Sequence, residues 1–169
     1  VGTHKYSQNS KGENIYHQNI TIRNNEFKNI HDNGVFVLNW KNTKIENNKF
    51  TNIGNSSKKS YSSGAHAISG GGIEEINITG NTFTKIKRNP VYFCIQQNVG
   101  GGSNYKKVGM KITKEETKAM LDNKVFDCGY DMNSIFHGYD ILYFKGSGER
   151  SRSNAVGVNI NKQIISYGL

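Results

Sequence analysis

Three side chains that could do chemistry stand at the centres of short apolar runs. They are Phe36, His66 and Tyr92, in the runs 35–37, 65–67 and 91–93. If each run is a strand whose outer residues face the interior, its central residue faces solvent. On neighbouring strands the three would form one outward column, with aromatic rings on which sugars can stack and an imidazole that can transfer protons. The alternative is that they only pack beneath long loops.

Polar residues on the bends beside these runs extend the candidate site. Asp32 and Asn33 precede the first run, Arg88 and Asn89 precede the third, and Tyr61 lies in a polar stretch before the second. An enzyme that removes a proton beside a sugar carboxylate needs a cation to neutralise the carboxylate and a base to take the proton. Arg88 with His66 or Tyr61 fits this requirement. We therefore predict His66, Arg88, Asp32 and Tyr61 as catalytic, and Phe36, Tyr92, Asn33 and Asn89 as substrate-binding.

A glycoside hydrolase would instead need two carboxylates about 5–10 Å apart. Asp32 is the obvious carboxylate near the column, and Glu74 and Glu75 lie in a neighbouring stretch. The hydrolase interpretation therefore rests on fewer residues. The five histidines form neither an HxH nor an HExxH pattern, so no metal site is predicted from them. We expect no cofactor, and Ca²⁺ remains an option without a clear site.

The elements that must position these residues form an internal repeat. Stretches beginning at Asn19, Asn42 and Glu75 superpose on one another, with offsets of 23 and then 33 residues. In each, apolar residues alternate, an Asn-rich corner follows, and a Phe and an Ile then stand three residues apart. Together with the apolar runs, each unit holds about three short strands and no helix. A unit of this length is typical of one turn of a parallel β-solenoid.

The repeat predicts ladders of identical residues inside the stack. Phe27, Phe50 and Phe83 occupy one position of successive turns, as do Ile30, Ile53 and Ile86. We expect both sets to stack in the core. Asparagines at the corners tolerate left-handed backbone and can hydrogen-bond to the equivalent group one turn away.

The recurring pattern N-x-I-x-I-x-x-N-x-F-x-x-I, followed by G-V-x-V, resembles the right-handed parallel β-helix of the pectate-lyase-like superfamily. That superfamily includes polysaccharide lyases, many glycoside hydrolases, sugar epimerases and phage tailspikes. The resemblance covers residues 13–95 well and the rest poorly. It implies an all-β, right-handed parallel β-helix that binds and cleaves an extracellular or cell-surface polysaccharide, as a lyase or a glycoside hydrolase. The alternative is a non-catalytic β-helix of a phage tailspike or surface adhesin.

The chain departs from this superfamily in its acidic motifs. It lacks the alternating Asp motifs and Gly-His-Gly of polygalacturonase-like hydrolases, and the multi-Asp calcium site of pectate lyases. The unequal offsets also predict insertions, which in repeat proteins map to loops, often on the binding face. With Ala65 aligned to Val35, about seven extra residues fall within 54–63 and about three within 69–75.

The chain is expected to form one β-helix domain over residues 1–169. Regular turns occupy 13–95, an irregular turn with an insertion 96–139, and closing strands 140–169. Thr113 and Glu116 form a capping box that predicts a short helix near 113–121, and Cys128 takes the position of Ile86 in a fourth turn. Because residues 1–18 align poorly with the repeats, we expect this domain to be part of a larger chain or to associate with a second copy.

The charge balance favours an anionic partner. There are 22 Lys and Arg against 13 Asp and Glu, which gives a net charge of +9. The chain has no long basic run and no nucleic-acid motif, so an acidic glycan or a teichoic-acid-like polymer is favoured over DNA, and a simply solvated basic surface is the alternative. No apolar run is long enough to span a membrane. We expect an extracellular, cell-surface or virion protein that binds polysaccharide.

Overall fold

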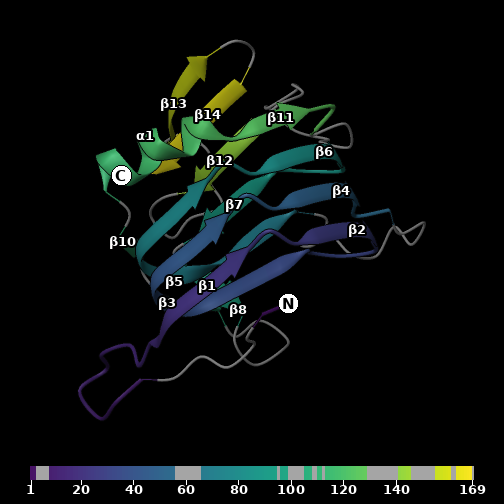
Figure 1. Cartoon of the computed structure of the whole chain (residues 1–169). Coiled ribbons are helices and arrows are strands. Elements are labelled where there is room, and N and C mark those ends of the chain that lie inside the picture. Colours follow the sequence, from purple (N-terminus) through teal and green to yellow (C-terminus); the bar gives the residue numbers. More distant parts are fainter. Residues whose placement is uncertain are drawn as a thin grey trace.

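The computed structural model shows an all-β chain whose parallel strands form two main sheets (Figure 1). It describes residues 1–2, 8–55, 66–94, 96–98, 105–107, 110–111, 113–128, 141–145, 155–160 and 163–168. The larger sheet contains, in order, β1 (His17–Arg23), β3 (Val35–Glu46), β5 (Ile68–Thr79), β7 (Val91–Cys94), β12 (Ile141–Lys145), β14 (Gln163–Gly168) and β13 (Ala155–Ile160), with β10 (Met110–Lys111) beside β5. The smaller contains β2 (Glu26–Ile30), β4 (Lys49–Ile53), β6 (Thr82–Ile86) and β11 (Lys124–Phe126). A separate antiparallel pair joins β8 (Gln96–Asn98) to β9 (Tyr105–Lys107).

Successive strands from β1 to β6 alternate between the two sheets, and each pairs in parallel with its equivalent in the next repeat. The register joins Ile22 to Ile45 and Ile45 to Ile78. These are the offsets that the sequence repeat predicts. The all-β, parallel part of the fold prediction is therefore confirmed.

Both β3 and β5 are 12 residues long because each crosses a corner. β3 turns at Asn39, with φ of 55°, and β5 turns at the equivalent Gly72, with φ of 64°. A Cβ atom on Gly72 would lie 2.2 Å from Asn39 Oδ1, so the second corner requires glycine. Before the corner β5 pairs with β7, and after it with β10. Each of these repeats therefore supplies three strand segments.

The predicted phenylalanine ladder fills the core. The rings of Phe27 and Phe50 stack with centroids 4.6 Å apart, and those of Phe50 and Phe83 with centroids 5.1 Å apart. Val125 continues this position in the fourth repeat. The isoleucine ladder ends in Cys128, which is buried, as predicted for a small core residue. Ladders of this kind are confirmed for both sets.

A third ladder, of asparagines, lies between the two sheets. It consists of Asn25, Asn48, Asn81 and Asn123, and the last three are buried. The backbone N–H of each of the first three donates to Oδ1 of the next asparagine, over 3.0, 2.9 and 2.9 Å. The side-chain amide of each of the last three donates to a backbone carbonyl oxygen at 2.8 to 2.9 Å. These buried amides are therefore satisfied one turn at a time, as the corner asparagines predict.

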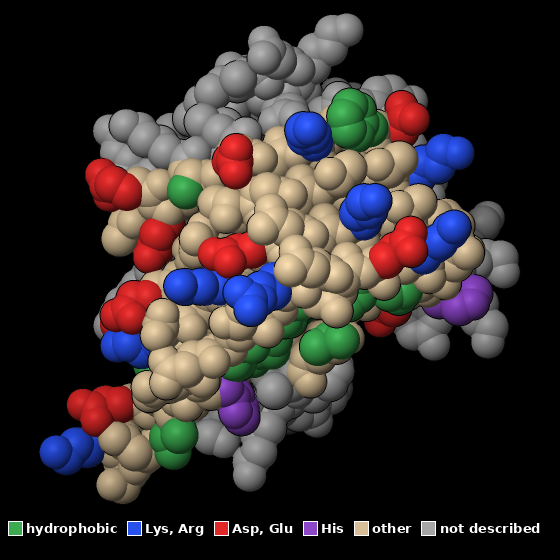
Figure 2. Space-filling view, viewed as in Figure 1, with side chains coloured by type: hydrophobic (Ala, Val, Ile, Leu, Met, Phe, Trp, Pro, Cys, Tyr) green, Lys and Arg blue, Asp and Glu red, His purple; other side chains and the backbone are tan. Residues whose placement is uncertain are grey.

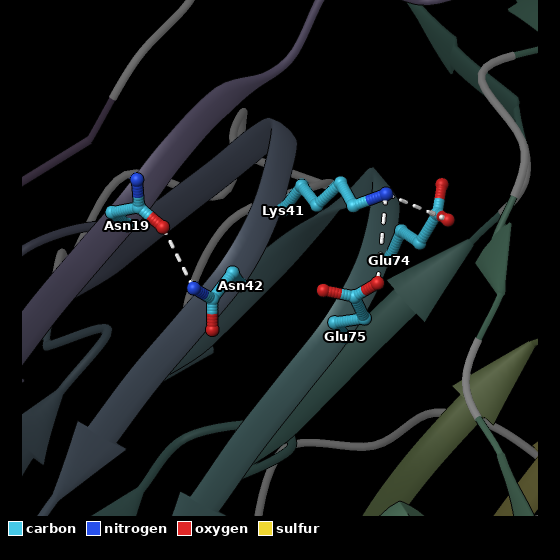
Figure 3. Close-up of polar contacts among 5 residues, drawn as sticks. All are labelled: Asn19, Lys41, Asn42, Glu74 and Glu75. Carbon is cyan, nitrogen blue, oxygen red and sulfur yellow. Dashed lines mark hydrogen bonds and ion pairs between the residues drawn. The ribbon is translucent and has the colours of Figure 1, made fainter.

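Left-handed backbone also recurs at fixed positions of the repeat. One such position holds Asn19, Asn42 and Glu75, and another holds Asn29, Asn52, Lys85 and Asp127, all with φ between 50° and 59°. Exposed amides bond along these positions, as in the 2.7 Å bond from Asn42 Nδ2 to Asn19 Oδ1 (Figure 3). The next repeat replaces this asparagine with Glu75, and Lys41 contacts both Glu74 and Glu75, at 3.2 and 3.5 Å.

The predicted placement of the insertion is wrong. Val35 pairs with Ile68, not with Ala65, and Ile68 pairs with Val91. Ile53 and Ile68 stand 15 residues apart, whereas the equivalent pairs Ile30 with Val35 and Ile86 with Val91 stand 5 apart. All ten extra residues therefore precede Ile68. The stretch 69–75, predicted as a loop, belongs to β5.

The predicted helix is present, and it is short. It comprises α1 (Lys114–Ala119) and the 3₁₀ turn η1 (Met120–Asp122). The capping box is reciprocal, because the Thr113 N–H donates to Glu116 Oε2 at 2.9 Å and the Glu116 N–H donates to Thr113 Oγ1 at 3.1 Å. Met120 is fully buried in the core beside the strands. The strands predicted to close the chain are also found, as β12, β13 and β14.

Replacing Phe50 with Ala should lower the free energy of unfolding by about 3–5 kcal/mol, because the ring is fully buried between two others. Chemical denaturation measures the loss. Phe126, which is 52% exposed, is the matched control, and its change to Ala should cost less than about 1 kcal/mol. Equal losses in the two variants would contradict the ladder.

Candidate functional site

The register of the larger sheet changes the predicted aromatic column. Phe36 pairs with Ser69, and Ser69 pairs with Tyr92. The residue between the two aromatic side chains is therefore Ser69, not His66. The prediction of a column of Phe36, His66 and Tyr92 is wrong by three residues in its middle turn, because the run 65–67 imitates the apolar pattern of a strand that begins at Ile68.

His66 instead belongs to a ladder at the corner that precedes the strands. Counting back from the paired residues Val35, Ile68 and Val91, it is equivalent to Asn33 and Asn89. The His66 N–H donates to Asn33 Oδ1 at 3.1 Å, and the Asn89 N–H donates to His66 Nδ1 at 3.1 Å. The imidazole Nδ1 therefore accepts the same backbone hydrogen bond that the amide oxygen of Asn33 accepts one turn earlier.

The environment of His66 keeps its imidazole neutral. The residue is only 3% exposed. Burial, followed by the positive charge of Arg88, lowers the pKa of His66 from 6.5 to about 3. Because Nδ1 accepts a hydrogen bond, the proton of the neutral ring lies on Nε2. His66 can then donate a hydrogen bond, but it offers no free lone pair for a general base.

Two members of the predicted platform do touch. The rings of His66 and Tyr92 stack, with centroids 4.6 Å apart and planes 10° from parallel. Tyr92 is half-buried, as is Phe36 two turns away. Between these rings the outer face of the sheet is covered, since Ser69 is 3% and Leu38 is 2% exposed, and β8 contacts β5. The stack of two rings is therefore partly exposed at Tyr92 and buried at His66, and the predicted column of three does not form.

The remaining predicted residues differ in their surroundings. Asp32 is exposed, Asn33 and Arg88 are half-buried, and Asn89 is buried. Arg88 acts on the same imidazole that Asn89 and Asn33 contact, so these residues share one corner. Tyr61 lies outside the described residues. Glu74 and Glu75, considered for a hydrolase, lie beyond the Gly72 corner and bind Lys41 (Figure 3).

Two buried polar atoms lie at or near the corner that contains His66, and the sequence did not identify either of them as a donor without a partner. Among the residues that the structure describes, the Ser69 hydroxyl and the Asn89 side-chain amide nitrogen find no hydrogen-bond partner. Ser69 adjoins Tyr92 in the register, and Asn89 bonds to His66. A buried donor without a partner is costly unless a ligand or water satisfies it. No sequence signal marks Ser69, since its position depends on the register of a glycine-rich strand.

Within the described ranges, no three His, Cys, Asp or Glu side chains gather as a metal site would require. In the same part of the chain, no helix has the length and apolar character needed to cross a membrane. Comparisons of the chain with known protein families, with curated proteins and with solved structures find no match. The site must therefore be interpreted from its own geometry.

Exchanging His66 for Asn should remove a pH dependence of stability. The pKa of His66 is about 3 in the folded chain and near 6.5 when unfolded, so the unfolded chain binds an extra proton between these values and stability falls as pH drops from 6.5 towards 3. From pH 7 to pH 5 this loss amounts to about 1–2 kcal/mol. Urea denaturation at both pH values should show a smaller loss for His66→Asn.

The control is the exposed His31, whose replacement by Asn should leave the loss between pH 7 and pH 5 as in the unaltered protein. If His66→Asn and the unaltered protein lose the same free energy, His66 is not held neutral by its corner.

Proposed function

We propose that this chain is a right-handed parallel β-helix that binds an acidic polysaccharide outside the cell, on the cell surface or on a virion. The observation that carries the binding function is the stack of His66 and Tyr92 at a corner where Asn89, the chain neighbour of Arg88, bonds to His66. An aromatic face supports a sugar ring, and a guanidinium pairs with a carboxylate through two parallel hydrogen bonds. Arg88 and Tyr92 are both half-buried, so each retains exposed surface.

The β-helix part of the proposal is supported by the pairing of equivalent residues. Three strand segments per repeat, with stacked Phe, Ile and Asn ladders, fit a solenoid in which each turn lies on the one before. The right hand follows from the strong preference of connections between parallel strands. The resemblance of residues 13–95 to the pectate-lyase-like superfamily points the same way.

Binding is proposed in preference to cleavage because of the state of His66. A lyase would have to use a base other than this imidazole, whose Nδ1 already accepts a hydrogen bond. A hydrolase would need a second carboxylate beside Asp32, and Glu74 and Glu75 bind Lys41 elsewhere. A tailspike-like or adhesin-like role needs neither group.

Replacing Tyr92 with Ala should weaken binding to polygalacturonate, alginate or hyaluronate by about 1–3 kcal/mol, by analogy with bases stacked on aromatic side chains. Isothermal titration calorimetry with each polymer measures the loss. Arg88→Gln should weaken binding to these acidic polymers. Neither this variant nor the unaltered protein should bind neutral dextran.

The half-buried Tyr16 on the N-terminal segment is the matched control, and Tyr16→Ala should bind as the unaltered protein does. The same samples are followed for unsaturated products and for new reducing ends. If either signal rises with time, the protein is a lyase or hydrolase, and the proposal of binding without cleavage is wrong.

A further inference from the structure

The charged side chains are distributed differently over the two sheets. On the larger sheet, the strands β1, β3, β5, β10 and β12 carry five basic residues and three acidic ones: Arg23, Lys41, Lys44, Lys111, Lys145, Glu46, Glu74 and Glu75. On the smaller sheet, β2, β4, β6 and β11 carry four lysines and one glutamate: Lys28, Lys49, Lys85, Lys124 and Glu26. Basic residues therefore outnumber acidic ones by four to one on the smaller sheet and by five to three on the larger sheet.

The four lysines stand at three different positions of the repeat, because Lys49 and Lys124 share one position and Lys28 and Lys85 occupy two others. Each strand of the smaller sheet contributes one, and all four are exposed. Because neighbouring strands lie about 4.8 Å apart, the outer surface of this sheet offers one ammonium group for every step of about 4.8 Å along the stack. We call this surface, formed by the outward residues of β2, β4, β6 and β11, the lysine face.

The two middle strands of the lysine face, β4 and β6, contain no acidic residue of their own. β4 and β6 contain the outward residues Lys49, Thr51, Thr82, Thr84 and Lys85. Glu26 on β2 pairs with Lys49 in the register, and Asp127, which follows β11, takes the position beside Lys85. Both ion pairs found in the described part of the chain involve Lys41 of the larger sheet. Figure 2 shows basic side chains spread over this side of the molecule, with scattered acidic ones between them.

Lys85 occupies a position that is unfavourable for the fold. Its φ is 54°, where the first two repeats have Asn29 and Asn52. Asparagine tolerates this left-handed conformation much better than lysine does. A strained residue of this kind is a reason to look for a function. The function inferred for Lys85 is to place an ammonium group at this point of the lysine face.

The lysine face also borders a polar hollow that suits sugar hydroxyl groups. The hollow has a volume of about 260 Å³ and is lined by Asn24, Asn25, Glu26, Asn47 and Lys49. The amide groups in this hollow can donate hydrogen bonds to hydroxyls and accept them, and the Glu26 carboxylate can accept them. A polymer of phosphate alone would use the lysine but not the amides.

We propose that the lysine face binds a linear acidic polysaccharide whose chain runs along the stack, one anionic group meeting one turn, with sugar hydroxyls entering the hollow beside Lys49. The proposal rests on the proposed function and adds a second surface to it, distinct from the corner of Arg88 and Tyr92. Flexible lysine stems adapt to anionic groups that are not spaced evenly.

The test compares two double variants of the full chain. Lys49→Gln with Lys85→Asn removes the two charges at the middle of the lysine face, and Arg23→Gln with Lys44→Gln removes two exposed charges from the larger sheet. Affinity for polygalacturonate and alginate is measured at low and at physiological salt. The first variant should bind roughly fivefold or more weakly, with a smaller salt dependence, and the second within about twofold of the unaltered protein.

Lys85→Asn alone should melt at the same temperature as the unaltered protein or higher, so its loss of affinity cannot come from unfolding. If Tyr92→Ala binds normally while the Lys49 and Lys85 variant is weakened, the corner site fails and the lysine face stands. The lysine face is overturned if both double variants lose affinity equally, or if neither does. It is also overturned if polyphosphate, duplex DNA or phosphatidylserine vesicles bind as tightly as the polysaccharides.

Discussion

Backbone hydrogen bonds join equivalent residues of successive repeats at one fixed register, and this pairing constrains every other part of the structure. It places like side chains directly above one another. Each side chain must therefore pack well against an identical side chain in the next repeat. Flat rings satisfy this condition inside, where Phe27, Phe50 and Phe83 lie nearly parallel. Buried amides satisfy it too, because Asn48 and Asn81 offer a donor to one side and an acceptor to the other.

The same pairing explains what the sequence could reveal. Phe27 and Phe50 occupy the same place in two stretches whose residues have the same spacing. Their stacking could therefore be predicted without knowing the fold. The capping box of Thr113 and Glu116 is likewise a contact over three residues. Such patterns predict contacts between residues far apart in the sequence only where every repeat shows the pattern.

The third repeat hides its pattern, and the candidate site depends on it. Its strand begins Ile68-Ser-Gly-Gly-Gly, and glycines have no side chains to show alternation. Gly70 is required by close contact with the neighbouring strand, since a Cβ here would overlap the Val37 carbonyl group. The preceding Ala-His-Ala therefore looked more like a strand than the strand itself. Residue types identified the corner of Arg88, Asn89 and His66, but burial of the imidazole depends on contacts that spacing does not encode.

The connection between Ile53 and Ile68 separates architecture from loop length. It is ten residues longer than its counterparts, yet Ile53 pairs with Ile86 and Ile68 with Val91 in the same register as elsewhere. The entropy of closing a flexible connection grows only logarithmically, about 0.6 kcal/mol for each doubling of its length. The stack thus behaves as a scaffold that tolerates a long connection between Ile53 and Ile68. Sequences of different length and chemistry could be grafted at this connection without disturbing the ladders on either side.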